Sequence, residues 1–299
     1  MFNLRSALVA GVVFGLSAVQ AHAAPVVLNT ANYAFSLQGD SGCYQMAVAY
    51  NPGTKQYYGG GGGGPGCNGT VWDAKGNKLQ SRSPINIDIR GVNYNPNTGA
   101  LEVTSYGSSY GYGGMVAMGL DSKGLYTGSN TVLVQTLAGL NSDQVVAAYD
   151  SKRDVLYSQE YGSAVNIVSH TNGDLLGTIA LTGANTSGSV VESIGYDVLN
   201  DVLIEYKYAT NQALVFGMDG VFLGASSIGG NGYYDSNYAM AYSNGYLFLG
   251  KGSTGGYDAF QILQAPAAAV PEPASLALLG FGLAGLVASR RRAARRKHA

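Results

Sequence analysis

Among the residues of this chain, Arg90 and Glu192 are the best candidates for a pair of catalytic side chains. Each lies four residues before a tyrosine that recurs along the chain, which predicts that both face one level of a shared channel, with Asp40 and Asp88 near its entrance. Glycosidases use two carboxylates roughly 5 to 10 Å apart. The simpler interpretation is an Arg–Glu pair that neutralises a buried channel. We favour it because these strands supply few further acids.

Histidine chemistry and metal binding are disfavoured. His170 is the only histidine outside the two terminal segments, and it follows Ser169 in a turn that is polar for local reasons. One histidine does not build a His-ligated zinc or haem site, so no cofactor and no metal ion are predicted. Six aspartates could offer oxygen ligands to Ca²⁺, but their spacing matches no calcium loop and turn formation explains them better. They are Asp73, Asp121, Asp150, Asp154, Asp197 and Asp219.

A repeat of nearly fifty residues positions these groups. In each unit a short apolar strand ends in tyrosine and leads through a turn into a second strand. The five tyrosines are Tyr50, Tyr94, Tyr149, Tyr196 and Tyr242, at spacings of 44, 55, 47 and 46 residues. A second hairpin signature follows the first four, with its turn glycine at Gly76, Gly124, Gly173 and Gly220. Two hairpins per period predict four strands per period.

These strands predict an all-β fold, namely a five-bladed β-propeller of four-stranded antiparallel blades. The fifth unit ends after its third strand, so we expect Val26–Leu37 to supply the missing outer strand and close the ring. Mostly small residues lie one and three positions before each tyrosine, which suits strands that converge on an axis. A β-sandwich is the alternative. At the level of pattern only, the repeats resemble extracellular propellers of the NHL and YVTN types.

Two glycine-rich stretches are expected to connect strands. Gly59–Gly64 has no phosphate-loop lysine and no helix after it, so we interpret it as a flexible hairpin connection. Tyr106–Met115 lengthens the corresponding hairpin of the second unit, and its Tyr and Gly residues suit a loop that stacks on sugar rings or on other proteins. A solvated loop with a few packed tyrosines is an equally good interpretation.

Residues 1–23 have the three parts of a secretory signal peptide. Arg5 gives the positive start, Ala7–Val19 the short apolar stretch, and Ala21-His22-Ala23 the small-residue cleavage site. We expect cleavage after Ala23, with Ala24 as the second choice. In the oxidising compartment beyond the membrane, the two cysteines Cys43 and Cys67 favour a disulfide. Its loop of about 25 residues would contribute roughly 3 kcal/mol on chain-entropy grounds.

Residues 267–299 form a second targeting segment. Pro271-Glu272-Pro273 is stiff and extended, the run from Ala274 to Ser289 carries no charge, and six cations follow. The apolar run is somewhat shorter than the roughly 20 residues of an ideal spanning helix, and the cations match a retained cytoplasmic end. This segment closely resembles the PEP-CTERM sorting signal. The resemblance implies export through the inner membrane of a Gram-negative bacterium, transient membrane insertion of the apolar run, and recognition of Pro271, Glu272 and Pro273 by an exosortase.

Residues 24–266 are then the propeller domain, and they are acidic. Of the 17 Lys and Arg, one lies in the signal peptide and six in the tail, whereas of the 18 Asp and Glu only Glu272 lies in either, which leaves a net charge of about −7. An acidic domain argues against nucleic acid and anionic polysaccharide as electrostatic partners.

The function expected from these features is that of an exported protein of the cell envelope or extracellular matrix. The resemblance associates such proteins with exopolysaccharide and biofilm. We therefore expect a non-catalytic binding or structural module, with the exosortase, the secretion machinery, and polysaccharide or matrix proteins as partners. The alternative is a carbohydrate-active enzyme, a glycosidase or lyase, that uses carboxylates at the propeller axis.

Overall fold

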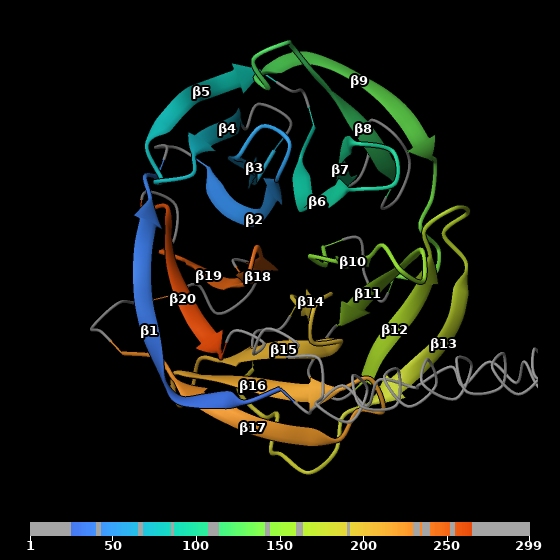
Figure 1. Cartoon of the computed structure of the whole chain (residues 1–299). Coiled ribbons are helices and arrows are strands. Elements are labelled where there is room, and N and C mark those ends of the chain that lie inside the picture. Colours follow the sequence, from blue (N-terminus) through green and yellow to red (C-terminus); the bar gives the residue numbers. More distant parts are fainter. Residues whose placement is uncertain are drawn as a thin grey trace, which may run out of the picture.

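The computed structural model describes residues 25–39, 43–64, 68–84, 87–106, 114–140, 144–159, 164–189, 192–229, 234, 240–251 and 255–264. Within these ranges the chain forms 20 strands and no helix. The strands lie in antiparallel sets around one axis, as the blades of a propeller do (Figure 1). The predicted all-β propeller is confirmed.

Three of the sets, which we call blades 1 to 3, are separate four-stranded sheets. Blade 1 consists of β2 (Tyr44–Asn51), β3 (Gln56–Gly62), β4 (Asn68–Asp73) and β5 (Lys78–Pro84). Blade 2 consists of β6 (Ile89–Asn95), β7 (Ala100–Ser105), β8 (Met115–Leu120) and β9 (Tyr126–Val134). Blade 3 consists of β10 (Ala148–Asp150), β11 (Val155–Gln159), β12 (Ala164–Ser169) and β13 (Leu175–Ala180).

The other two sets, blades 4 and 5, join into one eight-stranded sheet. Blade 4 consists of β14 (Gly195–Asp197), β15 (Val202–Lys207), β16 (Gln212–Gly217) and β17 (Phe222–Ser227). Blade 5 consists of β18 (Met240–Ser243), β19 (Tyr246–Gly250), β20 (Tyr257–Leu263) and the N-terminal β1 (Val27–Leu37). The two halves meet where β1 pairs with β17 in parallel, at Thr30 and Ser227.

The N-terminal strand closes the ring as expected. β1 runs antiparallel to β20 from Val27–Leu263 to Leu37–Tyr257, so the two ends of the described domain share one blade (Figure 1). A cluster at Asp258 fastens them, because its carboxylate accepts a hydrogen bond from Ser36 Oγ and lies 2.7 Å from Lys251 Nζ. Closing the ring in this way covers sheet edges that would otherwise be open to another chain.

In blades 1 to 4 the recurring tyrosine is the last but one residue of the inner strand, and the final residue of that strand shapes the turn. Its side-chain oxygen accepts a backbone N–H two residues on, from Gly53, Asn97, Lys152 and Leu199 in turn. The residues that accept are Asn51, Asn95, Asp150 and Asp197. Asn and Asp favour such turns for this reason. Asp73, Asp121 and Asp219 accept a backbone N–H two residues on in the same way, so the prediction that most of the six aspartates form turns is correct.

The glycine-centred second hairpins are also as predicted. Gly76, Gly124, Gly173 and Gly220 all have φ between 77° and 86°, a backbone conformation that favours glycine. They lie in the turns between β4 and β5, β8 and β9, β12 and β13, and β16 and β17. Each of blades 1 to 4 is thus two hairpins in series.

The core lies between neighbouring blades and is rich in aromatic rings. Tyr57 of blade 1 packs on Phe248 of blade 5 with 5.4 Å between ring centroids, and Trp72 meets Tyr257 edge-on at 6.4 Å. All four side chains are fully buried. Such pairs contribute beyond the area they bury, so the interface at which the ring closes is well packed.

The interpretation of Gly59–Gly64 as a flexible connection is wrong for most of its length. Gly59 to Gly62 belong to β3, every residue of which is buried. A Cβ on Gly59 would lie 2.7 Å from the Trp72 ring, and one on Gly60 would lie 2.4 Å from Ile89 Cδ1. These glycines are therefore needed for close packing, because large side chains of neighbouring strands rest directly on the backbone.

Candidate functional site

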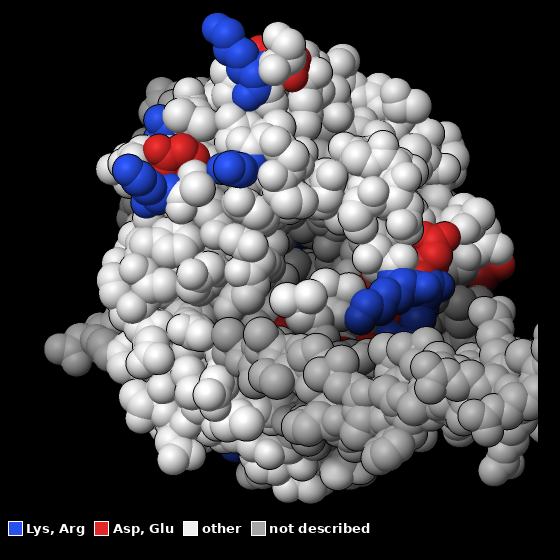
Figure 2. Space-filling model, viewed as in Figure 1, with Lys and Arg blue, Asp and Glu red and all other residues white. Residues whose placement is uncertain are grey.

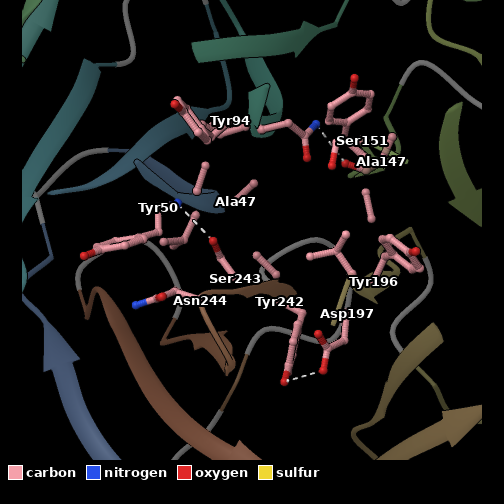
Figure 3. A pocket seen from close by; sticks show the side chains of 18 of the residues that line it. Ala47, Tyr50, Tyr94, Ala147, Ser151, Tyr196, Asp197, Tyr242, Ser243 and Asn244 are labelled. Atoms are coloured by element: carbon pink, nitrogen blue, oxygen red, sulfur yellow. Dashed lines mark hydrogen bonds between the residues drawn. The ribbon is translucent and has the colours of Figure 1, made fainter. Parts of the chain in front are cut away.

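One end of the propeller axis holds a pocket of about 460 Å³, visible as the central hollow in Figure 2. All five inner strands contribute to it, and the five recurring tyrosines lie around it (Figure 3). Ligand pockets commonly occupy several hundred Å³. The repeat that builds the fold therefore also builds the site.

Small side chains form the pocket wall. Ala47 and Ala49 come from β2, Ala148 from β10 and Ala241 from β18. They lie one or three positions before a recurring tyrosine, where mostly small residues were expected to face the axis. Larger side chains there would fill the space between converging strands, so the pocket exists because these positions are small.

Three of the five recurring tyrosines donate hydrogen bonds to aspartates of the neighbouring turns. Tyr149 Oη donates to Asp154 Oδ1 at 2.9 Å, Tyr196 Oη to Asp201 Oδ1 at 2.8 Å, and Tyr242 Oη to Asp197 Oδ2 at 3.2 Å. Burial, together with these carboxylates, raises the pKa of each of the three phenols. They remain protonated near neutral pH and serve as hydrogen-bond donors that fix the pocket rim.

Among the described residues that line the pocket, Asp197 is the only one of the acidic or basic residue types. Its Oδ1 accepts from the Leu199 amide at 2.9 Å, and its Oδ2 accepts from Asn200 Nδ2 at 2.6 Å and from Tyr242. A glycosidase of the usual kind needs a second carboxylate nearby. The described lining instead offers one hydrogen-bonded carboxylate, neutral polar groups and apolar surface, which suits recognition.

Arg90 and Glu192 lie toward the other end of the inner strands. Arg90 Nη2 pairs with Asp88 Oδ2 at 3.2 Å, and the guanidinium lies 4.8 Å from the Tyr106 ring centroid. Glu192 is buried, and its carbonyl accepts the Val146 amide at 2.7 Å. Asp88 is thus one charged partner of Arg90, and a joint role for Arg90 and Glu192 stays a prediction.

His170 has a role that the sequence did not indicate. Its Nε2 lies 2.6 Å from Glu102 Oε2, and its Nδ1 lies 2.9 Å from Asp154 Oδ1. Its ring packs at a tilt against the Tyr149 ring, with 4.6 Å between the centroids. Burial alone would lower its pKa, but the two carboxylates outweigh burial and raise it. The histidine joins blade 2 to blade 3, and no signal in the sequence pairs it with Glu102.

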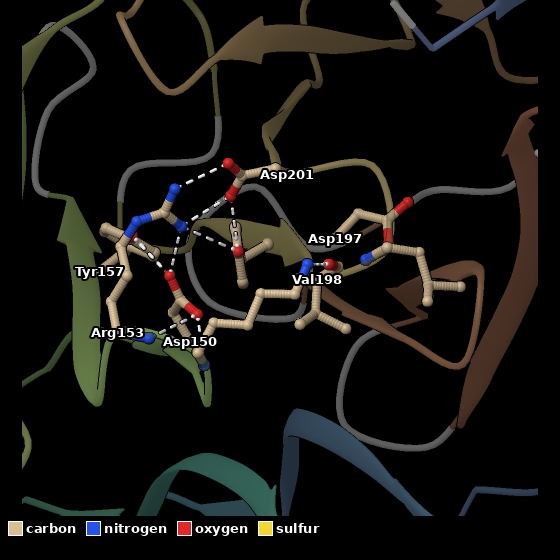
Figure 4. Close-up of polar contacts among 9 residues, drawn as sticks. Asp150, Arg153, Tyr157, Asp197, Val198 and Asp201 are labelled. Atoms are coloured by element: carbon tan, nitrogen blue, oxygen red, sulfur yellow. Dashed lines mark hydrogen bonds and ion pairs between the residues drawn. The ribbon is translucent and has the colours of Figure 1, made fainter. Parts of the chain in front are cut away.

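Arg153 makes a similar link between blades 3 and 4 (Figure 4). Its guanidinium forms two hydrogen bonds of 2.7 Å with Asp201 and one of 2.7 Å with Asp150. The neighbouring Lys152 Nζ donates to the Val198 carbonyl, and Val198 lines the pocket. This network holds two corners of the rim at a fixed separation.

Several predicted residues lie outside the described ranges. They are Ala23, Ala24, Asp40, Cys67, Pro271, Glu272, Pro273 and the apolar run that follows them, together with residues 107–113 of the Tyr106–Met115 loop. The Cys43–Cys67 disulfide and the signal cleavage therefore stay predictions. None of the described residues forms a helix long and apolar enough to cross a membrane.

A family model for the PEP-CTERM protein-sorting motif matches residues 269–292. The chain carries a PEP-CTERM motif. The matched range contains Pro271, Glu272 and Pro273, so the sorting resemblance is confirmed. The motif indicates a secreted, exosortase-processed protein associated with the cell envelope.

No curated protein matches the chain. Solved structures with a similar fold include a gluconolactonase from Xanthomonas campestris, at 14% identity and TM-score 0.46, covering 81% of this chain and 97% of that one. A protein of unknown function from Bacteroides thetaiotaomicron matches at 10% identity and TM-score 0.46, covering 78% and 76%. A nidogen/laminin complex matches at 13% and 0.41, covering 69% and 71%. None of these likenesses extends an activity to this chain.

Proposed function

We propose that the exported domain is a non-catalytic binding module of the cell envelope or extracellular matrix, with the axial pocket as its ligand site. Its partners are polysaccharide or matrix proteins, after export through the inner membrane of a Gram-negative bacterium. Exosortase cleavage near Pro271–Pro273 frees or relocates the domain. The sorting motif at residues 269–292 supports the route, and the pocket supports the binding role.

The observation that carries this proposal is the composition of the pocket. It is concave, lined by small and apolar residues, and held by turns in which Asn51, Asn95 and Asp197 are buried and hydrogen-bonded. A rim that is rigid before the ligand arrives binds with less loss of entropy. The single carboxylate of the described lining already accepts three hydrogen bonds, so it is better suited to orient a ligand than to attack one.

The test is to fill the pocket. Ala148 is half-buried in the wall, and Ala148→Leu would occupy part of the space without a new charge. The matched control is Ala100→Leu, at a half-buried alanine outside the pocket at the start of β7. We expect Ala148→Leu to release the exported protein from the envelope or matrix fraction, and the control to leave its distribution unchanged.

Two results would contradict this proposal. If both variants stay in the envelope or matrix fraction to the same extent, the pocket is not the site that binds the partner. Turnover of a glycan that is lost in Glu192→Gln while the fold is intact would make the protein an enzyme and overturn the proposal.

A further inference from the structure

The five pocket corners occupy the same place in the repeat but differ in chemistry. The residue two positions after each recurring tyrosine lines the pocket. These residues are Pro52, Pro96, Ser151, Val198 and Asn244. Because the backbone position is shared, the differences between the side chains determine what the rim can recognise.

Two adjacent corners are apolar and have the same sequence, Tyr-Asn-Pro. In blade 1, Asn51 Oδ1 accepts the Gly53 amide at 2.8 Å. In blade 2, Asn95 Oδ1 accepts the Asn97 amide at 2.9 Å. The asparagines are buried in their own turns, so each corner presents only its tyrosine and proline. The two prolines and the two tyrosine rings give one side of the pocket a largely apolar surface, and Figure 3 shows Tyr50 and Tyr94 on that side.

The other three corners carry polar groups that hold spare hydrogen-bonding capacity. Ser243 Oγ accepts the Tyr50 amide at 2.9 Å and still has its own hydrogen to donate. Asp197 accepts three hydrogen bonds, one fewer than a carboxylate can take. Ser151 and Asn244 add a hydroxyl and an amide to this arc. No Lys or Arg is among the described lining residues.

We propose that the pocket binds a neutral pyranose unit, with one carbon–hydrogen face on the two Tyr-Asn-Pro corners and its hydroxyls on the Ser151–Asp197–Asn244 arc. This inference rests on the proposed function and names its ligand class. A pyranose has an apolar face and a hydroxyl edge, which matches a pocket divided in the same way. An anionic sugar would lie beside Asp197 with no cation among the described lining to neutralise it.

The experiment uses the exported protein as the cell releases it. Saturation-transfer NMR is recorded with neutral disaccharides of glucose, galactose and mannose, with a uronic-acid disaccharide, and with a neutral tetrapeptide. The variants are Ala148→Leu, which fills the wall, and Ser151→Ala, which removes one hydroxyl from the arc. Ser187→Ala, at an exposed serine outside the pocket, is the control. Circular dichroism and thermal melts establish that each variant is folded.

A neutral disaccharide should receive saturation at its ring protons. Ala148→Leu should abolish this signal, Ser151→Ala should weaken binding about tenfold, which is 1.4 kcal/mol, and Ser187→Ala should leave it unchanged. If only the peptide or the uronate gives a signal that depends on Ala148, the pocket binds a ligand but the pyranose inference is overturned. If no probe gives a signal that depends on Ala148, both the inference and the binding role of the pocket fall.

Discussion

His170 Nε2 lies 2.6 Å from Oε2 of Glu102, and this contact joins two blades whose residues are far apart in sequence. Glu102 lies on β7 of blade 2 and is held from its other oxygen by Asn95 Nδ2 at 2.9 Å. His170 lies in the turn between β12 and β13 of blade 3. Because Asp154 takes the second ring nitrogen, the imidazole bridges two carboxylates and favours its protonated form.

This bridge predicts a loss of stability as the pH rises. The pKa of folded His170 is raised above its ordinary 6.5, so its stabilisation is fully present below pH 6.5 and is lost as the pH rises through the folded pKa. His170→Gln should lower the free energy of unfolding by about 2 kcal/mol at acidic pH and by less at alkaline pH. Urea denaturation of both proteins across this range is the measurement. An equal difference at every pH would contradict the bridge.

Glu205 leads us to expect a second loss of stability as the pH rises. Burial raises the pKa of its carboxyl to about 7, against the hydrogen bonds from Gln159 and Ser189 Oγ. Its stabilising protonation is fully present below pH 4.5 and is lost as the pH rises through about 7. Above that pH, Glu205→Gln should raise the free energy of unfolding, by at most about 3 kcal/mol. The control is Asp219→Asn at an exposed carboxylate, and a Glu205→Gln protein that is less stable at alkaline pH would refute the assignment.

The glycines of β3 predict a packing clash that a second substitution relieves. Gly60→Ala places a Cβ only 2.4 Å from Ile89 Cδ1 and should destabilise the fold by about 1 to 3 kcal/mol. Adding Ile89→Ala should make the pair less costly than the sum of the two single changes. Gly229→Ala, where a Cβ would meet nothing within 4 Å, is the control. Thermal and urea melts measure all four proteins, and strict additivity would argue against the contact.

Arg153 predicts a loss of stability at the interface of blades 3 and 4. Arg153→Met removes the cation from Asp150, whose side chain is fully buried, and from Asp201, which is exposed. The expected cost is about 2 kcal/mol, while Asp201→Asn should cost less because solvent can reach that carboxylate. Urea denaturation ranks the two variants. The reverse ranking would mean that Asp150 does not depend on Arg153.

The sorting motif predicts a defect in processing. Changing Pro271, Glu272 and Pro273 together to alanine should leave an exported protein that retains its C-terminal segment. Pro266→Ala, outside the matched residues 269–292, should be processed normally. The intact masses of the supernatant and membrane species decide the outcome. A wild-type protein that stays full-length and membrane-held would show that the tail is a plain anchor.

Much of the architecture could be predicted because its signals are local. A tyrosine followed by Asn or Asp specifies a strand end and a turn within five residues, and this pattern recurs at Tyr50, Tyr94, Tyr149 and Tyr196. Counting strands then leaves the fifth unit one short, which is why the position of β1 could be predicted. The small residues before each tyrosine likewise predicted that the inner strands converge on an axis.

The sequence by itself therefore determined the repeat, the turns and the sorting motif, since each depends on residues close together in the chain. Only the tertiary structure decided which side chains meet between blades, because that depends on how the closed ring aligns one repeat with the next. Position 60 requires glycine because Ile89 packs directly on its backbone. Arg90 pairs with Asp88, and His170 contacts Glu102, which lies 68 residues away in the sequence. The division of the pocket into an apolar and a polar side is of the same kind, because it exists only once the corners of all five inner strands surround one space.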